Sequence, residues 1–131
     1  MMVKATMDQL VKHLWVKTEI GGLARYENDQ YRRVSPETPG NPWFISTLRL
    51  ARWHIAVAST LEELKQGLNL LQWATKNALP SGALAEQLNP YTGEPISATP
   101  LLWSQAEFVN AVCEYLNKHQ QLTLKSEGTS G

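Results

Sequence analysis

The sequence predicts an all-α fold, and three observations support this prediction. Four segments repeat apolar residues at spacings of three and four, the period of an amphipathic helix. Each segment begins at a residue typical of a helix N-terminus. The chain has 131 residues, of which 43% are hydrophobic and 18% charged. This composition excludes disorder for most of the chain and suits one domain or part of one.

The first two helices are expected in the N-terminal half. The first begins at Thr6, because Gln9 three residues later completes a capping box, and it ends before Gly21. The second has Asn41 as its expected cap and Pro42 in its first turn. Its apolar stripe consists of Phe44, Leu48, Ala51, Ile55 and Ala58.

The other two helices follow in the C-terminal half. Thr60 with Glu63 forms a second capping box, and the short link before it predicts an antiparallel pairing of the second and third helices. The fourth helix has Thr99 as its cap and Pro100 in its first turn, and it ends near Asn117. The expected stripe of the third helix is Leu61, Leu64, Leu68, Leu71 and Thr75, widened by Leu70 and Trp73. That of the fourth is Leu102, Ala106, Val109, Cys113 and Leu116.

Two long connections separate these helices, at residues 20–41 and 79–99. Both contain aromatic and turn residues with few charges, which argues against disorder and is typical of functional loops. The second connection has the pattern of a short hairpin that pairs residues 83–88 with 94–98.

Charge and cysteine content exclude several classes of function. Twelve basic residues balance twelve acidic ones, so no nucleic-acid partner is expected. Cys113 is the single cysteine and cannot form an internal disulfide. No apolar run or signal peptide indicates a membrane partner or secretion, so a cytoplasmic location is the default expectation. The three histidines lack ligand spacing, and neither a metal nor another cofactor is expected.

The loops carry the residues suited to chemistry. Glu86 lies in an apolar run, where a carboxyl group can act as an acid or base, but a glutamate on the surface of a short strand gives the same pattern. Asp29, with Arg25 and Tyr31 nearby, fits either a substrate-binding cluster or a structural ion pair. Trp43 fits either a stacking platform or a core position. Aromatic platforms with arginine and carboxylates are the ingredients of a sugar site.

Four blocks of this sequence resemble, in order and spacing, the glucoamylase-type glycoside hydrolases of family 15. Residues 25–31 read RYENDQY and are similar to the family's RY…D.Y segment, and residues 36–44 read PETPGNPWF and contain its GNPWF block. Residues 84–87 read LAEQ. The segments YTGEP and LWS follow at residues 91–95 and 102–104.

This resemblance spans residues 5–118 and implies a partial (α/α)6 toroid, of which the chain covers the C-terminal third. Residues 1–119 are then expected to be part of a catalytic domain, and residues 120–131 a polar, disordered tail. The implied partners are an α-glucan or oligosaccharide substrate, and either the rest of the toroid or a second copy of the chain. The family's general acid lies upstream of every matching block, so the chain alone is expected to be inactive.

The resemblance also implies roles for individual residues. Glu86 aligns with the general base, which activates water in an inverting hydrolysis. Arg25 aligns with an arginine that binds the sugar next to the cleavage point, and Asp29 with its acidic companion. The implied substrate-binding set is Arg25, Asp29, Tyr31, Trp43 and Trp103. Gln30 replaces a usual threonine, and two arginines at 32–33 replace small or aromatic residues on the acceptor side of the pocket.

Three functions fit these observations. The first is a C-terminal portion of an inverting hydrolase. The second is a non-catalytic binding or regulatory module, as in the glucoamylase-like domains of phosphorylase kinase regulatory subunits. The third is a helical interaction protein in which Glu86 and Trp43 are structural. Retention of Glu86 favours the hydrolase.

Overall fold

The computed structural model describes the backbone of residues 2–79, 81–96 and 102–130, and the side chains of residues 6–79, 81–96 and 104–125. Its helices are α1 (Met2–Leu14), α2 (Phe44–Val57), α3 (Leu61–Lys76) and α4 (Leu102–Ser130), and its strands are β1 (Gln87–Leu88) and β2 (Pro95–Ile96). Helices dominate, so the chain is all-α, as the sequence predicts. No helix in the described part of the chain is long and apolar enough to cross a membrane.

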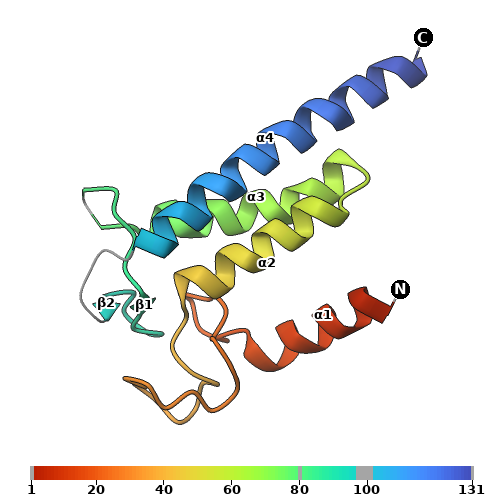
Figure 1. Cartoon of the computed structure of the whole chain (residues 1–131). Helices are drawn as coiled ribbons and strands as arrows, with labels where there is room; N and C mark the ends of the chain where they lie inside the picture. Colours follow the sequence, from red (N-terminus) through yellow and green to blue (C-terminus); the bar gives the residue numbers. More distant parts are fainter. Residues whose placement is uncertain (1, 80, 97–101, 131) are drawn as a thin grey trace.

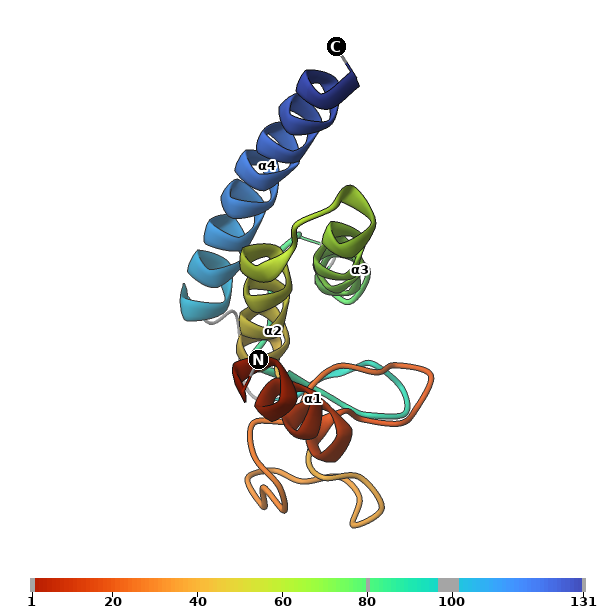
Figure 2. The same cartoon turned by 90° about the vertical axis from the view of Figure 1, so that its right-hand side faces the viewer.

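Three helices form the packed body of the molecule. Helix α2 packs against both α3 and α4, and α3 also contacts α4. Helices α2 and α4 begin at the same end of the molecule, and α3 runs in the opposite direction (Figure 1). Viewed from the side, α2 lies between α4 and α3 (Figure 2). This arrangement, in which α2 is antiparallel to α3 and parallel to α4, is consistent with part of an (α/α)6 toroid.

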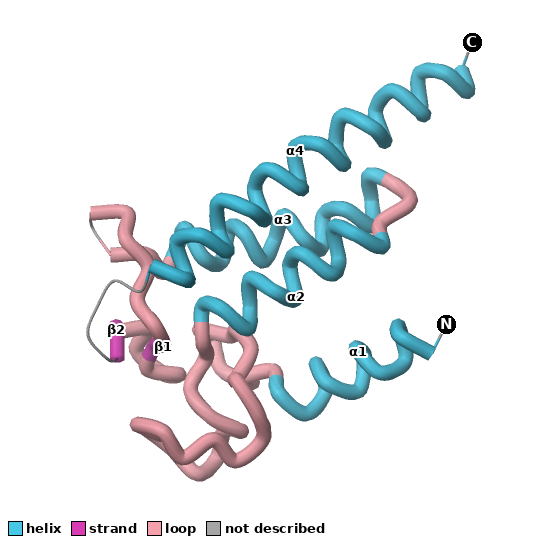
Figure 3. The backbone as a smooth tube through the Cα atoms, viewed as in Figure 1, coloured by secondary structure: helices cyan, strands magenta, loops and turns pink. Residues whose placement is uncertain are grey.

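The long loops gather at one end of this body. The loops that precede α2 and α4, together with the short hairpin, lie where α2 and α4 begin (Figure 3). Strand β1 pairs antiparallel with β2, Gln87 opposite Ile96 and Leu88 opposite Pro95. A hairpin therefore forms within the expected segments 83–88 and 94–98, but its described strands are only two residues long, and residues 97–98 lie outside the described residues. The two long connections, far apart in sequence, therefore meet at the same end of the helices.

Helix α2 supplies the centre of the core. All five residues of its predicted stripe are buried, with at most 4% of each residue exposed. Phe44 also packs its ring against Trp73 of α3, with ring centroids 5.1 Å apart. The spacing of apolar residues was sufficient here because α2 is covered by neighbours on both sides.

The predicted stripe of α3 is wrong at its ends. Leu61 is 39% exposed, and Thr75 is also exposed. The residues that face the core are Leu64, Gly67, Leu70, Leu71 and Ala74. This row passes through Gly67, which no pattern of hydrophobicity can identify. Glycine is needed because α2 approaches closely at this point.

Replacing Gly67 with alanine is expected to destabilise the fold by about 1–3 kcal/mol. Alanine ordinarily favours a helix over glycine by about 1 kcal/mol, but a Cβ atom here would lie 2.6 Å from Ile55 Cγ1 and 3.3 Å from the Ala51 carbonyl oxygen. Urea unfolding of the variant measures the change. Gln66→Ala, at the neighbouring exposed position, is the control and should not lower stability.

The predicted stripe of α4 faces solvent, which corrects the sequence analysis. Val109 is 58% and Leu116 59% exposed, and Ala106 and Cys113 are exposed as well; the side chain of Leu102 lies outside the described residues. The packed row instead contains Phe108, Ala111, Val112, Tyr115 and Leu122. Charged residues flank this row and obscure its pattern in the sequence.

Those charged residues hold α4 onto α2. Arg52 of α2 pairs with Glu114 at 2.7 Å and with Glu107 at 2.9 Å. Lys118 donates from Nζ to the carbonyl oxygens of Ala56 and Ala58, at 3.0 and 3.1 Å, and so satisfies the C-terminal end of α2. Helix α4 continues to Ser130, beyond the end predicted near Asn117, so residues 120–130 have helical backbone.

Acid is expected to weaken the packing of α4 on α2. Hydrogen bonding to Arg52 lowers the pKa of Glu114 below its ordinary value of 4.5. A carboxyl group whose pKa is lower in the folded state stabilises the fold above the unfolded pKa, and this stabilisation is lost as the pH falls through the folded value. The difference in unfolding free energy between the natural chain and Glu114→Gln should therefore be present at neutral pH and shrink as the pH falls below 4.5. A constant difference across that range would contradict the assignment.

The observed helix ends agree with only some of the capping signals in the sequence. The capping box at Thr60 is confirmed, because its side chain accepts from the Glu63 backbone N–H. Helix α1 instead begins at Met2, before Thr6, and it ends at Leu14 because the next residues are extended. The predicted cap of the fourth helix, residues 99–100, lies outside the described residues.

The predicted cap of α2 is also wrong. Trp43 occupies the N-cap position and its side chain makes no capping bond. Asn41 is buried two residues earlier, in a network that ties the loops together. An asparagine before a helix satisfies the cap pattern in sequence, but here long-range hydrogen bonds take up its amide.

Candidate functional site

A ladder of short backbone bridges brings segments of different loops together. Isolated antiparallel bridges join Trp15 to Leu23, Leu23 to Trp43, and Trp43 to Gln87. The backbone N–H of Phe44 also donates to the Glu86 carbonyl oxygen at 3.1 Å. The start of α2 is thereby fixed beside the segment that carries Glu86.

An ion pair forms the centre of the first loop. Arg25 donates from Nε to Asp29 Oδ2 at 3.0 Å and from Nη2 to Oδ1 at 3.2 Å. Asp29 is only 1% exposed, and its Oδ1 also accepts from the Tyr31 backbone N–H at 3.1 Å. Burial lowers the pKa of Arg25, but the hydrogen bond and charge of Asp29 outweigh it, so the net shift is upward. Asp29 therefore holds a charged guanidinium in a fixed orientation.

Aromatic rings surround this guanidinium. The Cζ atom of Arg25 lies 4.2 Å from the ring centroid of Trp43 and 5.6 Å from that of Tyr31. The Tyr31 and Trp43 rings are tilted, with centroids 6.1 Å apart. Contacts of this kind between a cation and aromatic faces stabilise the arrangement. Arg25, Asp29, Tyr31 and Trp43 therefore form one cluster.

Trp43 also carries a buried hydrogen-bond donor, its indole N–H. Only 5% of the residue is exposed, and its Nε1 has no hydrogen-bond partner among the described residues. A buried indole N–H normally finds an acceptor. A hydroxyl oxygen of a bound molecule would supply one.

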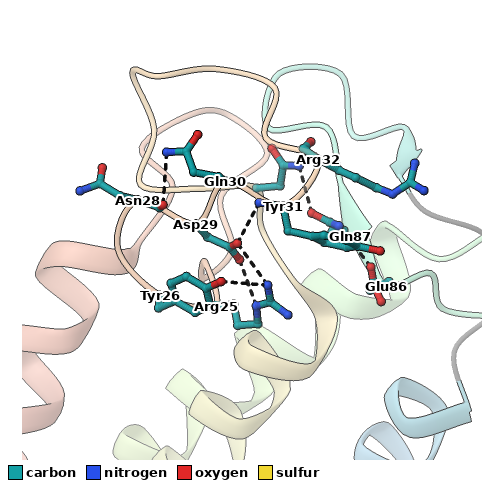
Figure 4. A network of polar contacts seen from close by, with 10 residues as sticks. Arg25, Tyr26, Asn28, Asp29, Gln30, Tyr31, Arg32, Glu86 and Gln87 are labelled. Carbon is teal, nitrogen blue, oxygen red and sulfur yellow. Dashed lines mark hydrogen bonds and ion pairs between the residues drawn. The ribbon is translucent and has the colours of Figure 1, made fainter.

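Buried amides connect the Glu86 carboxylate to the first loop. Figure 4 shows Glu86 and Gln87 beside the loop of Arg25–Arg32, with Gln87 Nε2 donating to Glu86 Oε1 at 3.2 Å. Asn41 donates from Nδ2 to Gln87 Oε1 at 3.0 Å and to the Arg32 carbonyl oxygen at 2.8 Å. Asn41 and Gln87 have at most 1% exposed. Because both amides are buried and bonded, they restrict the position of the half-buried Glu86 side chain.

Replacing Asn41 with alanine is expected to destabilise the fold by about 2 kcal/mol. The change removes hydrogen bonds to the part-buried Arg32 carbonyl oxygen and Val34 N–H, and one to the buried Gln87 Oε1. Loss of the partner of one buried polar group costs about 1–3 kcal/mol. Chemical denaturation provides the measurement. Asn110→Ala, an exposed asparagine of α4, is the matched control. Equal stabilities of the two variants would contradict the role given to the buried amide.

The structure brings together most of the residues that the sequence analysis selected. Arg25, Asp29, Tyr31 and Trp43 are in contact, and Glu86 lies on the adjoining segment. The side chain of Trp103 lies outside the described residues. Each residue's role stays a prediction. No group of three potential metal ligands occurs among the described residues.

Sequence reasoning missed Asn41 and Gln87 as parts of the site. Both belong to blocks already selected, GNPWF and LAEQ, but their polar side chains gave no sign of burial. Neither residue has a distinctive local signal, because Gln87 follows the charged Glu86 and Asn41 lies between Gly40 and Pro42. Only the contact between the two loops identifies the pair.

Comparison with known proteins finds similarity to glycosyl hydrolases. A model of the glycosyl hydrolases family 15 matches residues 54–113. An uncharacterized glycosyl hydrolase of Methanocaldococcus jannaschii is 34% identical over 107 residues, which cover 75% of this chain and 16% of the relative. The chain thus spans a small part of the relative's length. No solved structure matches the chain.

Proposed function

We propose that this chain, a segment of the glycosyl hydrolase family 15 type, supplies the general base and part of the sugar pocket of an inverting hydrolase of α-glucans. One observation supports the proposal above all. Arg25, fixed by the buried Asp29, lies over Trp43, and the next segment of the ladder carries Glu86. A cation, an aromatic face and a carboxylate suited to sugar recognition thus share one small region.

Arg25 and Trp43 are suited to bind sugar hydroxyl groups. A guanidinium has five N–H donors, of which Asp29 takes two and the Tyr26 hydroxyl shares one. The remaining donors and the Trp43 indole N–H are available to sugar oxygens. Because Asp29 fixes the guanidinium in advance, little conformational entropy is lost when a sugar binds.

Glu86 is suited to activate water. In an inverting mechanism a carboxylate removes a proton from water while the water oxygen attacks the anomeric carbon. The bond to the leaving oxygen breaks as a second carboxyl group donates a proton to it, and the two carboxyl groups lie about 6.5–9.5 Å apart. In this proposal Glu86 is the first group, and the second comes from a part of the catalytic domain outside this sequence.

Binding of maltotriose to the 131-residue chain tests the sugar pocket directly. We expect Arg25→Ala to weaken binding at least tenfold in a calorimetric or NMR titration, because the cation that contacts the sugar is lost. Glu86→Gln should bind almost as the natural chain does, since the amide keeps the shape of the side chain. Arg49→Ala, at a site 67% exposed on α2, is the control.

Equal affinities of the Arg25→Ala and Arg49→Ala variants would contradict the assignment of the pocket. Maltotriose binding by the natural chain, together with no hydrolysis by the complete domain, would instead favour the non-catalytic binding module. No contact in the described part of the chain favours that alternative over the hydrolase.

A further inference from the structure

A pocket that contains none of the proposed sugar-binding residues lies beside the end of α1. Its volume is about 320 Å³, near the lower end of the range typical of small-molecule sites. Its walls come from the end of α1, the extended segment after it, the loop before α2, and the turn between β1 and β2. The lining residues are Lys12, His13, Trp15, Lys17, Thr18, Glu37, Thr38, Pro39 and Tyr91. We call it the basic pocket.

Hydrogen bonds and close packing fix the walls relative to one another. The Thr18 hydroxyl donates to the Pro90 carbonyl oxygen, which joins the segment after α1 to the β1–β2 turn. The Tyr91 hydroxyl lies 3.0 Å from Ser35 Oγ and joins that turn to the loop before α2. Gly21, at φ +70°, packs against the Trp15 ring, where even a Cβ atom would lie 3.1 Å from the ring carbon Cζ2. The pocket therefore exists before a ligand arrives.

The charges of the basic pocket are unbalanced. Lys12, Lys17 and His13 face a single carboxylate, that of Glu37. Neither lysine forms an ion pair with any carboxylate in the described residues, although the chain as a whole is neutral. A pocket with unpaired ammonium groups attracts an anion.

Two aromatic side chains add a second requirement. Trp15 and Tyr91 belong to different walls of the pocket, and Tyr91 is 49% exposed. With the Thr18 and Thr38 hydroxyls, these rings resemble the mixture of aromatic and polar groups that fixes small ligands. An inorganic anion would use only the lysines. We infer that the basic pocket binds a sugar carrying an anionic group, such as a phosphate ester.

The basic pocket is separate from the proposed sugar-hydrolysing site. None of the residues that line the basic pocket belongs to the cluster of Arg25, Asp29, Tyr31 and Trp43, and Glu86 is not among them. The two sites therefore use different side chains. The sites share the loop before α2, since the Pro39 carbonyl oxygen accepts from the Asp29 backbone N–H at 3.2 Å.

Titration of the 131-residue chain with three probes tests this inference. Glucose 6-phosphate has both required features, glucose has only the ring, and inorganic phosphate has only the charge. We expect glucose 6-phosphate to bind at least tenfold more tightly than either control and to shift the NMR signals of the Gly21, Thr38 and Tyr91 amides. If inorganic phosphate binds as tightly as glucose 6-phosphate, the sugar ring is not required. If glucose binds as tightly, the anionic group is not required. If glucose 6-phosphate does not bind, the pocket is not a site for this class of ligand.

Variants identify the pocket and separate it from the hydrolytic site. The double variant Lys12→Gln, Lys17→Gln should weaken glucose 6-phosphate binding at least tenfold, whereas Glu37→Gln should strengthen it a few-fold, on the order of threefold, by removing a like charge. Lys65→Gln, at an exposed site on α3, is the control. Arg25→Ala should leave glucose 6-phosphate binding unchanged, and the double lysine variant should leave maltotriose binding unchanged. Loss of both ligands in either variant would contradict two separate sites.

Discussion

Replacing Glu86 with glutamine is expected to lower the rate of α-glucan hydrolysis about 10²–10⁴-fold in a complete catalytic domain that contains this segment. The amide preserves the size of the side chain and can still accept from Gln87, but it cannot take a proton from water. The loss should appear in kcat rather than in KM, because the carboxylate acts on the attacking water and not on sugar binding.

For this measurement, the present segment replaces the aligned part of the Methanocaldococcus relative in a hybrid enzyme. The release of glucose from maltose by the hybrid is then followed. Glu94→Gln is the matched control, since Glu94 is an exposed glutamate of the same hairpin region. A Glu86→Gln enzyme as fast as the Glu94→Gln enzyme would remove Glu86 from the mechanism. The 131-residue chain alone should release no glucose; release abolished by Glu86→Gln would show that the chain needs no second carboxyl group from elsewhere.

Whether the sequence predicted the buried face of a helix correctly depended on how neighbouring helices cover it. Helix α2 has neighbours on two sides, and its apolar stripe predicted its buried face correctly. Helix α4 has two apolar rows, and only the row through Ala111 and Leu122 is buried. Periodicity gives the rows but cannot decide which of them meets a neighbour. Gly67 illustrates the same limit, because close approach of two helices is a property of the pair.

In the candidate site, too, the sequence predicted some features, whereas others depend on contacts between distant segments. Resemblance to a family selected Arg25, Asp29, Trp43 and Glu86, and the ladder brings these loops together. Local spacing alone left Asp29 equally compatible with a structural ion pair, and the structure shows why. The ion pair with Arg25 is present, and in the proposed site the same contact fixes the cation that meets the sugar. A structural and a functional interpretation of one residue need not exclude each other.

The purified chain is expected to associate through the exposed row of α4. Val109, Leu116 and Leu124 are each 58–59% exposed, and the exposed Cys113 lies between the first two. These positions follow the helical spacing of three and four residues, and between residues 106 and 124 no position of this row carries a charge. Contiguous apolar patches larger than a few hundred Å² are rare on soluble monomers. Covering about 400 Å² would contribute on the order of 10 kcal/mol, comparable with the whole stability of a domain, about 5–15 kcal/mol.

Sedimentation across a range of concentrations, together with thermal melting, measures this association. Leu116→Glu should shift the chain toward monomer, because a charge on the row must be desolvated when the face is covered. Gln121→Glu adds the same charge at another exposed position of α4 and should leave the association unchanged. If a second copy of the chain covers the row, sedimentation should show a defined dimer. If the remaining helices of a toroid cover it, adding those helices as a separate chain should produce a stable complex of the two chains. A single monomeric species that melts cooperatively above about 60 °C, high for a mesophile domain, would show that the helices described here complete their own core and that the α4 row needs no cover.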